Sequence, residues 1–258
     1  MSGKADFSDL LPRVLSAIVM LALGAGSLWV GGDVFALVLI IAAGLMGWEM
    51  SRMHCVNHLV PMVFGLLIAA VTLCFMFLPL PWVVATAVIA AGAALVGHQR
   101  RPVAVLLMGI VIVLACTAFQ VLREGNAGFV MTLWLVLVVV ATDIGGYFAG
   151  KLIGGPKIWA RISPKKTWSG TLGGWVLAAL VGMAFYANGV GTVQIAAFSV
   201  LVAMASQAAD MAESAIKRQA GVKDSSNLIP GHGGLLDRFD GWLGAGLLVW
   251  VLRLIGAV

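Results

Sequence analysis

Long apolar runs separated by short polar segments fill almost the whole chain. Their lengths are close to the roughly 20 residues that an α-helix needs to cross about 30 Å of hydrocarbon. Helix-breaking residues such as glycine, proline and asparagine fall between the runs, as expected for turns. The pattern therefore predicts an all-α, polytopic membrane bundle of about nine transmembrane helices. Their approximate ranges are 14–31, 34–48, 61–78, 82–97, 103–121, 129–148, 171–187, 192–210 and 241–257.

Composition supports a membrane protein. Only 10% of the 258 residues are charged and 61% are hydrophobic, whereas a soluble domain carries about 25% charged residues. No segment is polar enough to form a soluble domain, so we expect one integral membrane domain over residues 1–258. Within it, helices in 14–121 would form a scaffold, and 129–258 would be catalytic, with cytoplasmic loops at 149–170 and 211–240. The three cysteines suggest neither a disulfide framework nor a zinc site.

The basic residues indicate how the chain is oriented. With the N-terminus in the cytoplasm, the inside segments hold 14 of the 16 lysines and arginines. This bias is typical of cytoplasmic loops. Only Arg123 and Arg253 fall elsewhere. The inside segments are 1–13, 49–60, 98–102, 149–170 and 211–240.

Residues 210–241 concentrate the charge of this apolar chain. They hold five of the eleven acidic residues, although a charge that faces hydrocarbon costs several kcal/mol. These side chains must therefore face water, a ligand or each other. Asp210, Glu213, Ser214 and Lys217 have the spacing of one helix face. The charged and histidine residues are Asp210, Glu213, Lys217, Arg218, Lys223, Asp224, His232, Asp237, Arg238 and Asp240.

Three carboxylates lie at the inner ends of the last two expected helices. Asp210, Asp237 and Asp240 would repel one another unless a proton or cation intervened. Hard oxygen ligands without a nearby histidine or cysteine cluster favour Mg²⁺ over zinc. The loop of residues 230–234, with three glycines, precedes a helix, which is a good arrangement for binding phosphate. The alternative is that these aspartates simply pair with neighbouring lysine and arginine side chains.

A second polar stretch should meet the first on the cytoplasmic face. Asp143 lies inside an apolar run, where an acid usually has a function, although it could also be a hydrogen-bonded packing residue. The turn Ser163-Pro164-Lys165-Lys166-Thr167-Trp168 opens onto a helix and suits a phosphate or lipid headgroup. Its lysines could equally be signals of orientation. The loop at 49–60 shows no pattern that assigns it a function.

These segments resemble the signature of the phosphatidate cytidylyltransferase (CDP-diacylglycerol synthase) family. Asp143-x-Gly145-x-Tyr147 and the Ser163–Trp168 turn resemble further elements of that family. The resemblance covers the C-terminal half, while the N-terminal half matches only as generic spans. The signature reads Ser214-x-x-Lys217-Arg218-x4-Lys223-Asp224 and then His232-Gly233-Gly234-x-x-Asp237-Arg238-x-Asp240.

The resemblance implies transfer of a cytidylyl group from CTP to phosphatidate, with Mg²⁺ either alone or together with a second cation. It also implies a homodimer in the bacterial cytoplasmic membrane, with its active site on the cytoplasmic side. Asp210, Asp237 and Asp240 would be the metal ligands. Asp237, Asp240, Lys217, Arg218 and Arg238 would be catalytic. The residues expected to bind substrate are Asp143, Lys165, Lys166, Ser214, Lys223, Asp224, His232, Gly233 and Gly234.

Two positions depart from the family pattern. Ser169 stands where members often have glutamate, and Ala209 stands where they often have glycine before the first metal-site aspartate. Two other functions also explain some of the sequence. A transporter would place charges near the membrane midplane and show paired halves, whereas a CTP-dependent lipid kinase would share the nucleotide and metal chemistry but transfer the γ-phosphate.

Overall fold

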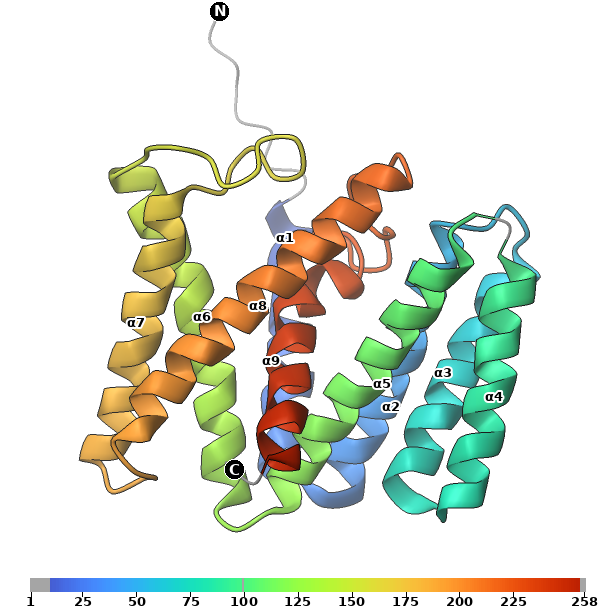
Figure 1. Cartoon of the computed structure of the whole chain (residues 1–258), viewed down its shortest axis with the longest axis horizontal. Helices are drawn as coiled ribbons and strands as arrows, with labels where there is room; N and C mark the ends of the chain where they lie inside the picture. The colour runs from blue at the N-terminus through green and yellow to red at the C-terminus, as the bar shows by residue number, and fades with distance from the viewer. Residues whose placement is uncertain (1–9, 99, 256–258) are drawn as a thin grey trace, which may run out of the picture. The chain divides into compact units, whose positions relative to one another are not determined.

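The computed structural model describes residues 10–98 and 100–255, and nine α-helices form within these ranges (Figure 1). Most of the polar tail expected over residues 1–13 lies outside them. The helices are α1 Leu10–Val30, α2 Gly32–Arg52, α3 Leu59–Phe77, α4 Leu80–Gly97, α5 Pro102–Glu124, α6 Gly128–Leu152, α7 Trp168–Ala187, α8 Gln194–Gln219 and α9 Leu236–Leu254.

The all-helical membrane architecture is confirmed. Within the described residues, eight helices, α1 to α8, are long and apolar enough to cross a membrane. The ninth expected span, 241–257, falls on α9, which is not among these eight. Charged residues at both ends of α9, Asp237, Arg238, Asp240 and Arg253, interrupt its apolar character. The cytoplasmic position of the N-terminus remains a prediction.

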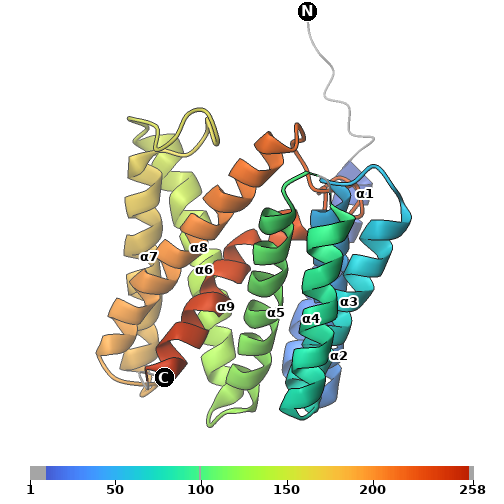
Figure 2. The same cartoon turned by 45° about the vertical axis from the view of Figure 1, so that its right-hand side comes forward.

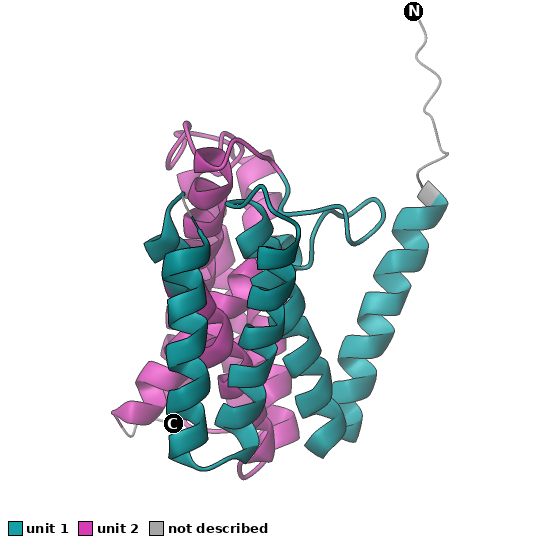
Figure 3. Ribbon diagram, turned by 90° about the vertical axis from the view of Figure 1, so that its right-hand side faces the viewer, with its two compact units in different colours: residues 1–106, 224–238 teal, residues 107–223, 239–258 magenta. Residues whose placement is uncertain are grey.

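The chain forms two compact units (Figure 3). Unit 1 contains residues 1–106 and 224–238, and unit 2 contains residues 107–223 and 239–258. The division does not follow the expected scaffold and catalytic halves, because part of the signature stretch clusters with the N-terminal helices. Whether the chain acts as one domain remains a prediction.

Unit 1 is built around α2, which packs against α3, while α3 also packs against α4. A β-carbon added at Gly65 would lie 2.8 Å from the Gly44 carbonyl oxygen, so these small residues allow the two helices to approach closely. Ser51 on α2 hydrogen-bonds to His98 after α4 at 2.7 Å, and both side chains are buried. By contrast, α1 and α4 leave most of their apolar residues exposed, as expected for helices that face lipid.

In unit 2, α7 lies alongside both α6 and α8 (Figures 1 and 2). Trp134 on α6 donates a hydrogen bond to Ser199 on α8 at 2.9 Å. Helix α8 also lies close to α9, because a β-carbon added at Gly244 would come within 2.7 Å of the Ala209 β-carbon. Ala209, one of the two departures from the family pattern, therefore packs against a glycine. This close packing holds α8 against the part of α9 that belongs to unit 2.

We predict that replacing Gly244 with alanine destabilises the protein. The added methyl group would collide with Ala209 and with the Ala205 backbone, and overpacking of this kind typically costs about 1–3 kcal/mol. The matched control is Gly92→Ala on α4, where the added group meets nothing within 4 Å. Thermal unfolding in detergent should show a lower midpoint for Gly244→Ala only. Equal midpoints for the two variants would contradict the proposed close packing.

Candidate active site

A pocket of about 530 Å³ in unit 2 gathers charged residues from α6, α8 and the loop between α6 and α7, and α7 contributes uncharged lining residues. It is lined by two aspartates and four lysines, although the chain as a whole is strongly apolar. Opposite charges from separate elements therefore converge on one cavity. The charged residues are Asp143, Lys151, Lys157, Lys165, Lys166 and Asp210.

The loop before α7 is held by its own backbone and by a helix cap. The Ile158 N–H donates to the Lys166 carbonyl at 3.2 Å. Thr167 caps α7, since its side-chain oxygen accepts a hydrogen bond from the Gly170 N–H at 3.2 Å. The Ser169 hydroxyl, where the family often has glutamate, donates to the Gly154 carbonyl. Ser169 thus fastens the loop to the first turn of α7.

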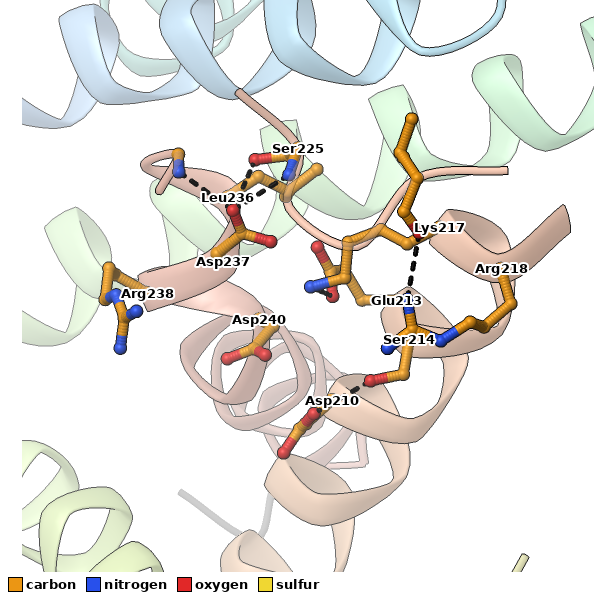
Figure 4. Close-up of polar contacts among 12 residues, drawn as sticks. Asp210, Glu213, Ser214, Lys217, Arg218, Ser225, Leu236, Asp237, Arg238 and Asp240 are labelled. Carbon is orange, nitrogen blue, oxygen red and sulfur yellow. Dashed lines mark hydrogen bonds and ion pairs between the residues drawn. The ribbon is translucent and has the colours of Figure 1, made fainter. Parts of the chain in front are cut away.

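Lys166 and Asp210 form an ion pair inside this pocket. Their side chains are only 26% and 28% exposed. Ser214, one helical turn further along α8, donates a longer hydrogen bond to Asp210 at 3.5 Å (Figure 4). The expected meeting of the loop with the inner end of α8 is confirmed by this pair.

A second ion pair lies along α8. Lys217 contacts the Glu213 carboxylate at 2.5 Å, and the two side chains are 10% and 1% exposed (Figure 4). Such a pair is stable only while both charged groups are present, because a single buried charge without its partner is costly. Arg218 lies on the exposed side and donates to the Val222 carbonyl at 2.9 Å.

Asp240 lies in the first turns of α9, and its side chain accepts a hydrogen bond from the Gly241 N–H at 2.7 Å. Burial raises the pKa of the Asp240 carboxyl well above its ordinary range, and the negative charges of Asp210 and Glu213 raise it further. A cation between Asp240 and Asp210 would relieve this repulsion. The carboxylate pair fits Mg²⁺, which usually binds one or two carboxylates together with substrate phosphates.

The structure does not form a complete protein cage for a metal. Within the described part of the chain, no three histidine, cysteine, aspartate or glutamate side chains group closely enough to hold an ion. Asp210 and Asp240 belong to unit 2, whereas Asp237 belongs to unit 1. The expected set of three carboxylate ligands therefore remains a prediction.

Asp237 organises residues 224–235, the segment of unit 1 before α9, which we call the signature loop (Figure 4). Its Oδ2 atom accepts hydrogen bonds from the Ser225 N–H at 2.9 Å, the Ser225 hydroxyl at 3.0 Å and the Gly234 N–H at 2.8 Å. Gly233 has a φ of 89°, a conformation that favours glycine. Its N–H donates to the Ile229 carbonyl at 3.1 Å.

The expected phosphate-binding glycines thus donate within their own loop. Binding of a phosphate by the Gly233 and Gly234 N–H groups would require an exchange of these partners, and that function remains a prediction. His232 hydrogen-bonds through Nδ1 to Ser16 on α1 at 2.9 Å, and its carbonyl accepts two bonds from Arg238. Lys223 and Asp224 are exposed.

Three contributors were missed by sequence reasoning. Lys151 and Lys157 line the pocket, but their positions suggested only signals of orientation. Glu49 on α2 is completely buried and binds the signature loop, in a segment that showed no functional pattern. A lone glutamate near the end of an apolar run was the available signal for this residue, since such an acid needs a partner.

The fold and this site define a polytopic membrane protein equipped to handle phosphate compounds. The sequence model of the cytidylyltransferase family matches residues 11–255. The chain is 34% identical over 262 aligned positions to a phosphatidate cytidylyltransferase of Brucella suis biovar 1, covering 97% of this chain and 95% of that protein. It is 31% identical over 266 positions to one of Pseudomonas aeruginosa, covering 88% and 91%. The chain therefore belongs to the cytidylyltransferase family.

We predict that Lys166→Met weakens nucleotide binding much more than Arg161→Met. Lys166 lines the pocket and pairs with Asp210, whereas Arg161 lies on the same loop but is exposed and outside the pocket lining. Loss of one charge-assisted contact costs about 1.5–3 kcal/mol, or roughly 10-fold to 100-fold. Equilibrium binding of CTP to the purified variants measures the difference. Equal affinities would remove Lys166 from the site.

Proposed function

We propose that this chain transfers the cytidylyl group of CTP to phosphatidate, giving CDP-diacylglycerol and pyrophosphate. Family membership supports the reaction, and relatives over nearly the full chain are phosphatidate cytidylyltransferases. The observation that carries the proposal is the pocket in unit 2, with four lysines and two aspartates in an otherwise apolar protein. The lysines outnumber the aspartates, and this excess of positive charge suits phosphate groups because it raises the local concentration of anionic ligands.

The proposed reaction does not need a strong general base. The phosphate of phosphatidate is already an anionic nucleophile. One of its oxygens attacks the α-phosphorus of CTP in line, and the bond from that phosphorus to the bridging oxygen breaks. Pyrophosphate leaves with the electron pair. The protein must therefore align two polyanions and stabilise the charge that grows on the leaving group.

Basic side chains would neutralise the phosphates. In this proposal Lys165 and Lys166 hold phosphate in the pocket, and Lys217, Arg218 and Arg238 stabilise the leaving group. The remaining substrate-binding residues would position the nucleotide and the lipid headgroup. These are Asp143, Ser214, Lys223, Asp224, His232, Gly233 and Gly234.

Mg²⁺ would be held by Asp210 and Asp240, with Asp237 as a third ligand, either alone or with a second cation. When bound, the metal would neutralise charge on the triphosphate and on departing pyrophosphate. The acidic side chains serve to hold that positive charge next to the lysines. The interleaving of acids and bases along α8 and α9 follows from this need.

The proposed enzyme works as a homodimer in the bacterial cytoplasmic membrane, with its site on the cytoplasmic side. Phosphatidate would enter sideways from the inner leaflet, and CTP would enter from the cytosol. The hydrogen bond between Ser16, near the start of α1, and His232 supports placing the N-terminal end and the signature loop on the same side.

The test uses purified protein in detergent with phosphatidate, Mg²⁺ and CTP labelled at the α- or the γ-phosphate. We predict that α-label enters the lipid, because the α-phosphorus is attacked. The γ-label should leave in pyrophosphate. Entry of γ-label into the lipid would instead indicate a CTP-dependent lipid kinase, and a well-folded sample without either transfer would favour a transporter.

Removal of divalent cations should abolish the transfer reversibly. We expect chelation to stop product formation, and added Mg²⁺ to restore it, because the leaving pyrophosphate needs neutralisation. Asp240→Asn should require more Mg²⁺ for half-maximal rate, by at least about tenfold. Asp33→Asn, in the first turn of α2, serves as the matched control. The same Mg²⁺ requirement in Asp240→Asn as in the wild type would contradict the metal assignment.

A further inference from the structure

Glu49 is a fully buried carboxylate on a membrane-spanning helix. Its relative exposure is 0%, and it lies near the C-terminal end of α2. A buried carboxylate is costly unless it is well hydrogen-bonded. Glu49 therefore needs strong donors, and the structure shows where they come from.

The hydrogen bonds that the structure gives this carboxylate come from the signature loop and from the first residue of α9. Oε1 accepts from the Ser226 hydroxyl at 2.5 Å and from the Leu235 N–H at 2.9 Å. Oε2 accepts from the Leu236 N–H at 2.6 Å. These contacts link α2 to a loop more than 170 residues away along the chain, and all of them lie within unit 1.

The position of these donors gives Glu49 the function of a helix cap. Leu236 is the first residue of α9, and the first N–H groups of a helix have no partner within the helix. A negative charge at this end also interacts favourably with the helix dipole. Glu49 thus fixes where α9 begins, from another helix rather than from the preceding residue.

Glu49 and Asp237 accept hydrogen bonds from different donors in the same segment of the chain. Asp237 accepts from Ser225 and Gly234, while Glu49 accepts from Ser226 and from the backbone immediately after Gly234. A β-carbon on Gly234 would lie 2.5 Å from Glu49 Oε1 and would also collide with the Ser225 hydroxyl. Only glycine leaves room for both carboxylates to bind the loop.

We infer that Glu49 is a positioning residue for the transfer reaction. By capping α9 and binding Ser226, Glu49 fixes the position of Asp237. In this assignment Glu49 contacts neither substrate nor metal. It acts through Asp237, which directly follows Leu236, one of the residues that donate to Glu49. The inference rests on the proposed function, since it gives Asp237 its catalytic purpose.

The experiment compares Glu49→Gln with Ser51→Ala. Glutamine keeps the size of the side chain but loses the charge and one acceptor, so the N–H of either Leu235 or Leu236 loses its partner. Ser51→Ala removes a buried hydrogen bond of the same helix, to His98, which does not involve the signature loop. Both variants should lose some thermal stability, and only the first should affect the loop.

Two readouts are expected to change in Glu49→Gln alone. Amide hydrogen exchange in a peptide that contains Leu235 and Leu236 should become faster, which requires no activity. The maximal rate should fall, and the Mg²⁺ concentration for half-maximal rate should rise, each by about 10-fold to 100-fold, as for other partners that orient metal ligands. Glu49→Asp keeps the charge on a shorter side chain, so its exchange rate and its kinetic parameters should lie between those of Glu49→Gln and the wild type.

Several outcomes would overturn the inference. Unchanged exchange at Leu235 and Leu236 would show that Glu49 does not hold α9. Faster exchange with an unchanged rate and Mg²⁺ requirement would show a merely structural residue. If Glu49→Gln does not fold, Ser226→Ala replaces it, and an unchanged Mg²⁺ requirement there would count against positioning. Absence of transfer in the wild type would refute the proposed function separately, leaving the exchange result to test the cap.

Discussion

A carboxylate inside an apolar helical bundle is stable only when hydrogen-bond donors or cations surround it. The arrangement of this protein depends on that constraint. Glu49 accepts hydrogen bonds from two residues of the signature loop and from the first residue of α9, and Glu213 pairs with the Lys217 ammonium. Asp210 pairs with Lys166 from a different element. Glu49 and Asp210 therefore each connect separate elements, and the Asp210–Lys166 pair lies in the pocket of unit 2.

The same contacts explain how an apolar protein could bind two polyanions. Lys166, which already pairs with Asp210, is held in place with its charge partly balanced. Phosphate groups can then compete for the lysines, while a cation can bind the aspartates, so that little charge has to be buried without a partner. This account gives the acids and the bases of the pocket one shared purpose, since each group stabilises the site before the substrates arrive.

The sequence predicted the helices well because hydropathy and length alone decide whether a segment can span a membrane. It also predicted the continuation of α8 beyond the apolar run, which the spacing of Asp210, Ser214 and Lys217 indicated. The contribution of α2 could not be predicted, because one glutamate in an apolar helix does not reveal its distant partner. The glycine loop was correctly located, yet the acceptors of its N–H groups depend on Asp237 and on tertiary packing. Lys151 and Lys157 resembled orientation signals, since a loop charge has the same sequence signature whether it faces water or a pocket.

The most direct measurement of the central claim is anomalous diffraction from crystals grown with Mn²⁺ in place of Mg²⁺ and a non-hydrolysable CTP analogue. The account predicts a manganese peak bound by the Asp210 and Asp240 carboxylates, with the analogue's phosphates contacting Lys165 and Lys166. A manganese peak away from both aspartates, or a triphosphate outside the lysine-lined pocket, would contradict it.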